Sequence, residues 1–157
     1  MNAEDREVTI SMLIQPAQSN SYGNVHGGEI MKLMDNTAGV AAIKYARRYV
    51  VTARVDELQF HEPIHIGEFV ICRGRVVYVG RTSMEIYVTV DVENLLDKGN
   101  NRHALDAYFT LVAIDENAKP TEVPPFTPVT EEEKELWERV RARRERDSKR
   151  REELKAR

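Results

Sequence analysis

The sequence predicts an α+β fold in which an antiparallel sheet wraps around one long central helix. Three observations predict it. One segment has the apolar period of a long buried helix, and four consecutive segments after it have the pattern of strands. The connections between those strands are short, so we expect neighbouring strands to pair antiparallel. A sheet of this size has an apolar face that must be covered, and that helix is the element available to cover it.

The elements follow one another in a simple order. A first strand is expected over residues 7–14, followed by a turn-rich stretch over 15–28. The helix is expected over about 27–48, where small and apolar side chains recur at helical steps and are present nearly all round. Its main apolar stripe consists of Ile30, Met34, Thr37, Ala38, Ala41 and Tyr45. The later strands are expected over residues 50–60, 69–79, 84–93 and 103–114.

Charge divides the chain into unequal regions. Charged residues make up 31% of the 157 residues, and 20 of them lie within residues 131–157. Three prolines, Pro124, Pro125 and Pro128, indicate an extended linker before that segment. The sequence therefore predicts one domain over residues 1–120, a proline-rich linker over 121–130 and a charged C-terminal helix over 131–157.

Composition excludes several classes of protein. No apolar run is long enough to span a bilayer, and the charged start of the chain is unlike a secretory signal. The lone cysteine, Cys72, cannot form an internal disulfide, so we expect a reducing, cytoplasmic setting. Residues 1–130 carry 12 basic and 17 acidic side chains, which argues against nucleic-acid binding by this region. We expect neither a nucleic-acid nor a membrane partner.

The segment from Asn24 to Gly28 leads directly into the predicted helix. Its two consecutive glycines, Gly27 and Gly28, allow a ligand to approach the backbone closely, and the N–H groups of a first helical turn have no partner within the helix. Such a terminus suits a phosphate or a developing oxyanion. A glycine turn needed only for packing is the alternative.

Asp35 is an unusual residue for the middle of this helix. On a helical wheel it shares a face with apolar or small residues, and a carboxylate there is costly unless it is exposed or has a partner. Gly39, one turn later, lowers helix propensity by roughly 1 kcal/mol relative to alanine. Its presence indicates that another group fits closely against this face. A carboxylate satisfied by a neighbouring backbone or hydroxyl group is the alternative.

The spacing of these two features predicts an oligomer. Asp35 lies eight residues after Gly27, which is about 12 Å along a helix. Both cannot act on one carbonyl group, where contacts of about 3 Å are needed. If both are catalytic, two such helices must lie antiparallel across a two-fold axis, so that Asp35 of one chain faces the glycines of the other.

Several motifs in a fixed order resemble the hotdog-fold acyl-CoA thioesterases, and most closely the YciA-like and cytosolic (brain-type) acyl-CoA hydrolases. The resemblance extends from about residue 7 to residue 128. The motifs are the segment from Asn24 to Asn36, Val51-Thr52-Ala53, the stretch from Phe60 to Gly67, Val79-Gly80-Arg81-Thr82-Ser83-Met84-Glu85, the stretch from Ala107 to Ala113, and Val123-Pro124-Pro125.

The resemblance implies a role for each candidate residue at a site shared between two chains. Asp35 is implied to be the catalytic carboxylate, either as general base for water or as nucleophile, and Asn24 to help position the water or the thioester. The N–H of Gly27 or Gly28 from a partner chain is implied to polarise the thioester carbonyl. His26 is a separate candidate for substrate contact, although we favour a structural role for it.

The resemblance also implies how the substrate and the chains assemble. Arg81, Thr82 and Ser83 are placed near the nucleotide phosphates of CoA, where a guanidinium fork and hydroxyl groups are suitable donors. An ordinary β-turn is the alternative interpretation of that segment. The family builds its sites in homodimers and often assembles trimers of dimers. No cofactor is implied, since CoA is part of the substrate.

Other candidate chemistry is not supported. His61 and His65 have the i,i+4 spacing of metal ligands, but Pro63 between them prevents the helix that would align them, so we expect no metal site. A serine hydrolase lacks support, because the chain has no G-x-S-x-G motif. We expect Cys72 to be a core residue.

The C-terminal segment is expected to be a solvated helix anchored at Trp137. Residues 141–151 hold seven basic side chains, which could bind nucleic acid or an acidic membrane. We favour solvation, because four acid-to-base i,i+4 pairs in the favourable orientation can neutralise the charge within the helix. These pairs are Glu135–Arg139, Glu145–Lys149, Asp147–Arg151 and Glu153–Arg157.

The sequence therefore predicts a homo-oligomeric thioesterase that converts acyl-CoA and water into a free acid and CoA. An acyl-CoA hydratase or dehydratase of the same fold is one alternative, although no histidine lies on the helix face with Asp35. A non-catalytic acyl-CoA sensor is the other, and only the C-terminal segment could serve as its output.

Overall fold

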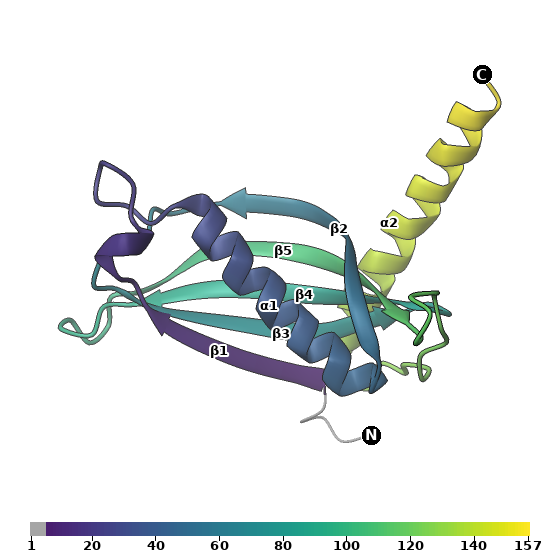
Figure 1. Cartoon of the computed structure of the whole chain (residues 1–157), viewed down its shortest axis with the longest axis horizontal. Coiled ribbons are helices and arrows are strands. Elements are labelled where there is room, and N and C mark those ends of the chain that lie inside the picture. Colours follow the sequence, from purple (N-terminus) through teal and green to yellow (C-terminus); the bar gives the residue numbers. More distant parts are fainter. Residues whose placement is uncertain (1–5) are drawn as a thin grey trace.

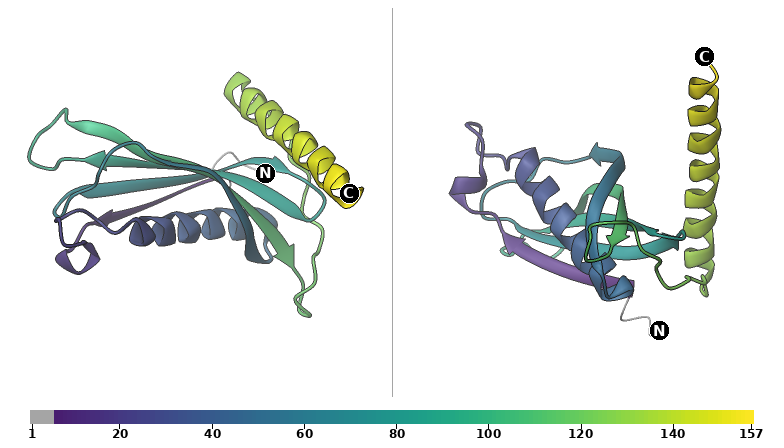
Figure 2. Two further views of the ribbon diagram at one scale, coloured as in Figure 1. Left: turned by 90° about the horizontal axis from the view of Figure 1, so that it is seen from above. Right: turned by 45° about the vertical axis from the view of Figure 1, so that its right-hand side comes forward.

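The computed structural model describes residues 6–157 and forms three layers, with one helix on each face of a five-stranded antiparallel sheet (Figures 1 and 2). We expected no secretory signal because the first residues of the chain are charged, and most of these residues lie outside the described part of the chain. The elements in chain order are β1 (Glu7–Leu13), the short 3-10 helix η2 (Pro16–Gln18), α1 (Gly27–Ala46), β2 (Tyr49–Phe60), β3 (Phe69–Val79), β4 (Ser83–Glu93), β5 (Asn101–Ile114) and α2 (Glu131–Lys155).

The strand order in the sheet is β1-β3-β4-β5-β2. The expectation that consecutive strands pair is confirmed for β3, β4 and β5 and is wrong for β2 and β3. Because β1 and β4 already occupy both sides of β3, the chain crosses after β2 to the other edge of the sheet, and β2 pairs with β5 instead. This connection closes the sheet around α1 and leaves β1 and β2 as the two edge strands.

α1 lies across one face of the sheet, as the sequence predicts (Figure 1). All six residues of the predicted stripe are buried in the core between α1 and the strands. The expectation of burial nearly all round is wrong, because Met31, Val40 and Ile43 are 39%, 41% and 43% exposed. These three side chains lie on the face of α1 that this chain leaves uncovered. The helix ends at Arg47, which adopts a left-handed conformation with φ of 54°.

α2 packs against the opposite face of the sheet from α1 (Figure 2). It begins with a capping box, in which the Thr130 side chain accepts from the Glu133 N–H. Leu136 and Val140 are buried in a second small core against the sheet. Trp137 is half-buried, and its ring lies 5.4 Å from that of Tyr78. The predicted anchor at Trp137 is thus one part of a larger contact.

The charge of α2 is not neutralised as the sequence analysis expects. Of the four expected i,i+4 pairs, none forms an ion pair within residues 6–157. Two arginines instead turn inward, where Arg143 and Arg144 contact the two carboxylate oxygens of Glu85 on β4 at 3.2 and 3.1 Å. Leu136 and Val140 draw this face of the helix onto the sheet, and burial raises the pKa of the Glu85 carboxyl. The C-terminal segment, α2, therefore packs against the sheet and is held there by ion pairs to the buried carboxylate of Glu85.

β2 is an irregular edge strand. Its register against β5 shifts between Thr52 and Arg54 and again between Asp56 and Gln59. Within the second irregularity Glu57 has a φ of 56°, in the left-handed region. The strand therefore bends along its length as it passes over α1.

The loop from β2 to β3 is fixed by one ion pair. Arg102 on β5 donates to both carboxylate oxygens of Glu68 at 2.6 Å and to the carbonyl of Pro63 at 2.8 Å. The backbone N–H of His65 donates to the same carboxylate at 2.8 Å. These hydrogen bonds hold the pKa of the Glu68 carboxyl below its usual value. This loop pairs with the segment that precedes α1, through an isolated bridge between Asn24 and His65.

Cys72 is fully buried in the main core, as expected, and burial raises the pKa of its thiol to about 11. Within residues 6–157, no helix has the length and apolar character needed to cross a membrane.

Candidate functional site

The N-terminus of α1 is built as a donor site. His26 occupies the N-cap position in an extended conformation, and its side chain makes no capping hydrogen bond. Its backbone N–H donates to the Gln18 carbonyl at 2.8 Å, which ties the helix start to η2. Within the described part of the chain, the N–H groups of Gly27 and Gly28 have no hydrogen-bond acceptor. Both groups remain available to a ligand, as the sequence predicts for a first helical turn.

The two glycines differ in their surroundings. A Cβ atom added to Gly27 would lie 3.2 Å from Cζ of Phe60, the last residue of β2. A Cβ on Gly28 would meet no atom within 4 Å, and the same holds for Gly39 on the face of Asp35. The packing interpretation therefore accounts for Gly27. Gly28 and Gly39 border open space in this chain, where a second body can approach the helix.

Asp35 is half-buried on the uncovered face of α1, and its partner is a residue that the sequence analysis did not single out. The Thr52 hydroxyl on β2 donates to Asp35 Oδ1 at 2.6 Å. Within residues 6–157 the other carboxylate oxygen, Oδ2, has no hydrogen-bond partner. One oxygen is thus fixed by the strand and the other is open to a ligand. Thr52 lies in the Val51-Thr52-Ala53 motif, so the motif was the signal that could have identified it.

An apolar surface surrounds this carboxylate. Met31 of α1 lies one turn before Asp35 and is about two-fifths exposed, and Gly39 lies one turn after it. Val51 on β2 is 47% exposed, and the outer edge of that strand has no neighbour in the sheet. A carboxylate, an apolar helix face and an unpaired strand edge therefore occupy one side of the molecule.

Within one chain, the two halves of the predicted site are separated. α1 is continuous from Gly27 to Ala46, so Asp35 and the glycine donors lie on one helix with eight residues between them. That spacing corresponds to about 12 Å. Within one chain, Asp35 and the glycine donors are therefore too far apart to act on one carbonyl group, as the sequence predicts. No histidine side chain is hydrogen-bonded to Asp35 in residues 6–157.

The turn that contains Arg81, Thr82 and Ser83 leads into β4, which is separated from β2 and Thr52 by one strand, β5. Ser83 faces α2 and not the side of the sheet that carries Asp35. Ser83 pairs with Val112, and Val112 pairs with Val51, the neighbour of Thr52. Arg81 is exposed, and its carbonyl accepts from the Val123 N–H at 3.0 Å. The Ser83 hydroxyl does not point toward Asp35, since it accepts from Arg144 of α2 at 3.2 Å.

A cavity of about 590 Å³ adjoins this turn, between α2 and the outer face of the sheet. Ser83 and Glu85 line it from β4, and Arg54 lines it from β2, where Arg54 also pairs with Asp147 of α2 at 2.7 Å. The remaining positive charge comes from arginines of α2, namely Arg141, Arg143, Arg144 and Arg151. α2, which was expected to be only solvated, thus supplies four of the five arginines of this cavity, and four carboxylates line it as well, those of Asp56, Glu85, Glu145 and Asp147.

Two asparagines shape the loop before α1. Asn24, the predicted positioning residue, has its backbone N–H bonded to the side-chain oxygen of Asn20 at 3.2 Å. The same oxygen accepts from the Tyr22 N–H at 2.9 Å, and the Asn20 N–H donates to the Asn24 carbonyl at 2.7 Å. The sequence analysis missed Asn20, whose side chain folds the loop that presents the helix terminus.

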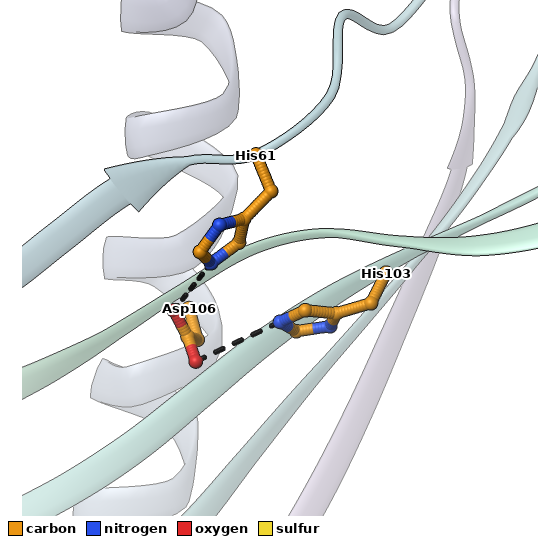
Figure 3. Close-up of side chains that lie close together, drawn as sticks. All are labelled: His61, His103 and Asp106. Atoms are coloured by element: carbon orange, nitrogen blue, oxygen red, sulfur yellow. Dashed lines mark hydrogen bonds and ion pairs between the residues drawn. The ribbon is translucent and has the colours of Figure 1, made fainter.

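The histidines are arranged differently from the pair considered in the sequence. His61 does not meet His65 but lies beside His103 and Asp106, which come from β5 (Figure 3). These three residues are the group in the described chain that could hold a metal ion. His103 and Asp106 lie on β5, and His61 directly follows the end of β2.

The chain is similar to known proteins over most of its length. A family model described as "Thioesterase superfamily" matches residues 22–96. The chain is 37% identical over 149 residues to the cytosolic acyl coenzyme A thioester hydrolase of Rattus norvegicus. That match covers 91% of this chain and 39% of the rat protein, so the chain spans about two-fifths of the length of this relative.

Two solved structures match nearly the whole chain. A hexameric acyl-CoA thioesterase without ligand superposes with a TM-score of 0.89 and 37% identity, covering 96% of both chains. An acyl-CoA hydrolase from Staphylococcus aureus, in complex with butyryl coenzyme A and coenzyme A, superposes with a TM-score of 0.86 and 30% identity, covering 98% of this chain and 93% of its own.

The S. aureus hydrolase has also been solved with alanine in place of one asparagine, one aspartate and one threonine. In that chain the asparagine lies 15 residues before the aspartate, and the threonine lies 17 residues after it. Here Asn20 and Thr52 stand at these same spacings from Asp35.

Proposed function

Because the chain belongs to the thioesterase superfamily, we propose that it hydrolyses acyl-CoA to a free carboxylic acid and CoA. The observation that carries the proposal is the half-buried Asp35, with one oxygen held by Thr52 and the other open, on a helix whose first N–H groups have no acceptor. A carboxylate and free backbone donors are the two elements that thioester hydrolysis requires. The names of the matched relatives support the same reaction.

The reaction follows from these two elements. As general base, Asp35 takes a proton from water while the water oxygen attacks the thioester carbonyl carbon. The negative charge that develops on the carbonyl oxygen is stabilised by backbone N–H groups, and the loss of one such donor typically costs about 2.7–4 kcal/mol. The C–S bond then breaks, and the thiolate of CoA takes the proton from Asp35. As nucleophile, Asp35 would itself attack the carbonyl carbon and expel the CoA thiolate, and water would then hydrolyse the resulting anhydride and supply the proton that the thiolate takes.

We place the active site between two copies of the chain. Asp35 would act with the N–H groups of Gly27 and Gly28 of the partner subunit, because those of its own helix lie too far along the axis. The uncovered face of α1, the open space at Gly28 and Gly39, and the unpaired edge of β2 supply a surface that a second copy can cover across a two-fold axis. Hexamers among the matched structures support further assembly, and we propose a trimer of dimers.

The nucleotide end of CoA is proposed to bind near Arg81, Thr82 and Ser83. The structure adds a reason, because Arg144 donates to the Ser83 hydroxyl and belongs to the arginine-lined cavity beside the turn. Arginine forks are well suited to phosphate groups. The tail would then contribute to substrate binding, which the sequence analysis did not expect.

Asn20 joins the proposed site beside Asn24. Its side chain fixes the loop through the Tyr22 and Asn24 N–H groups, and it stands at the spacing of the asparagine altered in the S. aureus hydrolase. Asn24 and His26 stay predictions, as residues that face the thioester from this loop. The proposal includes a cytoplasmic enzyme that needs no cofactor and binds neither nucleic acid nor membrane.

Replacement of Asp35 by asparagine tests the reaction. We expect D35N to release thiol from acyl-CoA with a kcat lowered by about 10²–10⁴-fold, because the side chain can no longer accept the proton. CoA binding, measured by calorimetry, should persist. The matched control is D97N, a change in the exposed loop after β4.

A near-normal kcat in D35N contradicts the proposal. Hydration of an enoyl-CoA without thiol release would favour the hydratase alternative. Acyl-CoA binding without turnover in the unaltered protein would favour the sensor.

A further inference from the structure

A cluster of two histidines and one aspartate lies on the sheet, outside the proposed active site (Figure 3). His61 Nε2 lies 3.3 Å from Asp106 Oδ1, and His103 Nε2 lies 3.6 Å from Asp106 Oδ2. The ligating atoms of the three residues all lie within 4.8 Å of one another. Their side chains are 41%, 42% and 29% exposed, so the cluster is open to solvent.

A bulge in β5 brings this cluster together. His103 and Asp106 are three residues apart, and in a regular strand they would point to opposite faces. The register between β4 and β5 shifts between Val90 and Asp91, so that Val90 pairs with Leu105 while Asp91 pairs with His103. Ala104 is the extra residue, and it returns His103 to the face of Asp106. His61 follows directly after β2 and is held there by its N–H, which donates to the Ala104 carbonyl at 2.8 Å.

Two of the three residues, His103 and Asp106, have a partner outside the cluster that orients them. Asp91 Oδ1 lies 3.0 Å from His103 Nδ1, which leaves Nε2 of that ring directed at Asp106. The other oxygen of Asp91 accepts from Arg73 at 3.0 Å, so the orienting carboxylate is itself fixed. The Tyr87 hydroxyl donates to Asp106 Oδ2 at 2.9 Å. A carboxylate behind the distal nitrogen of a histidine is the arrangement that holds metal-ligating imidazoles in place.

We propose that His61, His103 and Asp106 form a binding site for a divalent transition-metal ion, with Zn²⁺ as its representative. Two ligand atoms bound to one Zn²⁺ ion at about 2.1 Å in tetrahedral geometry lie about 3.4 Å apart. His61 lies 3.3 Å from Oδ1 of Asp106 and His103 lies 3.6 Å from Oδ2, both close to that separation, and small side-chain rotations bring the three donor atoms, now within 4.8 Å of one another, around one ion. Solvent supplies the fourth ligand, since the cluster is exposed. The two imidazole donors favour Zn²⁺ and its neighbours over Mg²⁺ or Ca²⁺, which prefer oxygen ligands.

The bound ion would cross-link the end of β2 to β5. It joins the residue after β2 to two positions on β5, across the end of the irregular edge strand. His61 follows Phe60, whose ring lies against Gly27 at the start of α1. Occupancy therefore holds the strand end that abuts the helix terminus. The site requires no residue of the proposed hydrolytic machinery, so metal binding and thioester hydrolysis can be tested separately.

Direct binding to the 157-residue chain, free of any polyhistidine tag and stripped with a chelator, tests the proposal. We expect calorimetric titration with Zn²⁺ to show one ion per chain, and titration with Co²⁺ to give visible absorption from nitrogen and oxygen ligands. H103N and H61Q should each weaken Zn²⁺ binding at least about 10-fold. Asp91 contacts His103 and Arg73 but neither of the other two ligand residues, and D91N should weaken Zn²⁺ binding by about 10-fold or more.

The matched control is H65N, which alters an exposed histidine four residues beyond His61. It should bind Zn²⁺ as the unaltered chain does. Zn²⁺ should raise the midpoint of thermal unfolding of the unaltered chain and of H65N but not of H103N. Circular dichroism checks that the variants fold. Both ligand histidines are exposed, so neither H61Q nor H103N should disturb the core, and each tests the site independently.

The proposal is overturned if Zn²⁺ binds without a defined stoichiometry, or if H103N and H61Q bind it as tightly as the unaltered chain. Equal weakening in H65N and H103N would also overturn it, since that result would place the ion elsewhere.

Discussion

The Thr52 hydroxyl donates a hydrogen bond of 2.6 Å to Asp35 Oδ1, and so connects the edge strand to the carboxylate in the central helix. The two residues are 17 positions apart in the sequence. This contact leaves one oxygen of the carboxylate fixed and the other open, and it sets the direction in which Asp35 can accept a proton.

Replacing Thr52 by valine should lower kcat by about 10–100-fold, the effect of losing one hydrogen bond to a charged group at about 1.5–3 kcal/mol. T52S keeps the hydroxyl and should retain most activity. Thr52 is exposed, so neither change should alter the unfolding midpoint. Equal kcat values for T52V and the unaltered chain would show that the contact has no catalytic role.

Mixed dimers test whether the active site is shared. G27P removes one donor at the first helical position, where proline is tolerated, and the extended conformation of His26 suits a residue before proline. The added side chain approaches the Phe60 ring at 3.2 Å, and because that ring is exposed it can move aside. D35N and G27P should each be nearly inactive alone. After refolding together they should recover about a quarter of normal activity, because half of the dimers contain one intact site of two. Recovery of no activity would contradict a site built from two chains.

Arg81 should matter for the nucleotide part of the substrate. We expect R81A to raise KM for acyl-CoA about 10-fold, the effect of losing a charge-assisted hydrogen bond. KM for an acyl-pantetheine, which lacks the nucleotide, should not change. K98A, which removes an exposed cation from the loop after β4, is the matched control. An equal rise in KM for both substrates would place Arg81 elsewhere along the substrate.

The buried pair between Arg143 and Glu85 should contribute strongly to the docking of α2. R143M should lower the free energy of unfolding by about 3 kcal/mol, because it leaves a buried carboxylate without one of its partners. In the double variant, E85Q should restore part of that loss by removing the charge. Chemical denaturation of the four proteins measures the coupling, and strictly additive effects would show that the two residues act independently.

Acid should weaken the ion pair between Glu68 and Arg102 that holds the loop from β2 to β3. The hydrogen bonds from Arg102 lower the pKa of Glu68 below 4.5, its value in an unfolded chain. The paired carboxylate therefore stabilises the fold above about pH 4.5, and this contribution is lost as the pH falls through the pKa of the folded state. We expect E68Q to be less stable than the unaltered chain by about 1 kcal/mol at pH 7. The difference should shrink in acid, and a difference constant between pH 7 and pH 3 would contradict this cause.

Local patterns in the sequence predicted most of the elements. The strand and helix bounds follow from apolar periods, and the structure places them within a few residues of the prediction. The pairing of β2 with β5 could not be predicted from the same patterns, because it depends on which edge of the sheet remains free once β1 has paired with β3. Short connections favour adjacent strands but do not determine which edge a strand joins.

In the candidate site, too, some residues could be identified from the local sequence and others could not. Asp35, Gly27 and Gly28 stand out because a carboxylate and adjacent glycines are unusual in and before a buried helix. Thr52 does not stand out, since threonine is ordinary in a strand and its role depends on the packing of β2 over α1. Glu85 looks like a solvent-facing residue in an alternating strand until α2 covers it. The roles of Thr52 and Glu85 both depend on contacts between elements that are distant in the sequence, which local patterns do not reveal.

The two irregularities of β2 restrict what can join the sheet at its open edge. An unbroken edge of 12 residues would accept almost any extended peptide, which is how unrelated chains add to sheets and aggregate. Because the register of β2 shifts twice and Glu57 turns out of line, its outward N–H and carbonyl groups do not form one long straight row. Only a strand whose own bends match can form more than a short ladder with it. The strand most certain to match is β2 of another copy, so the kinks that bend the edge also select against foreign strands.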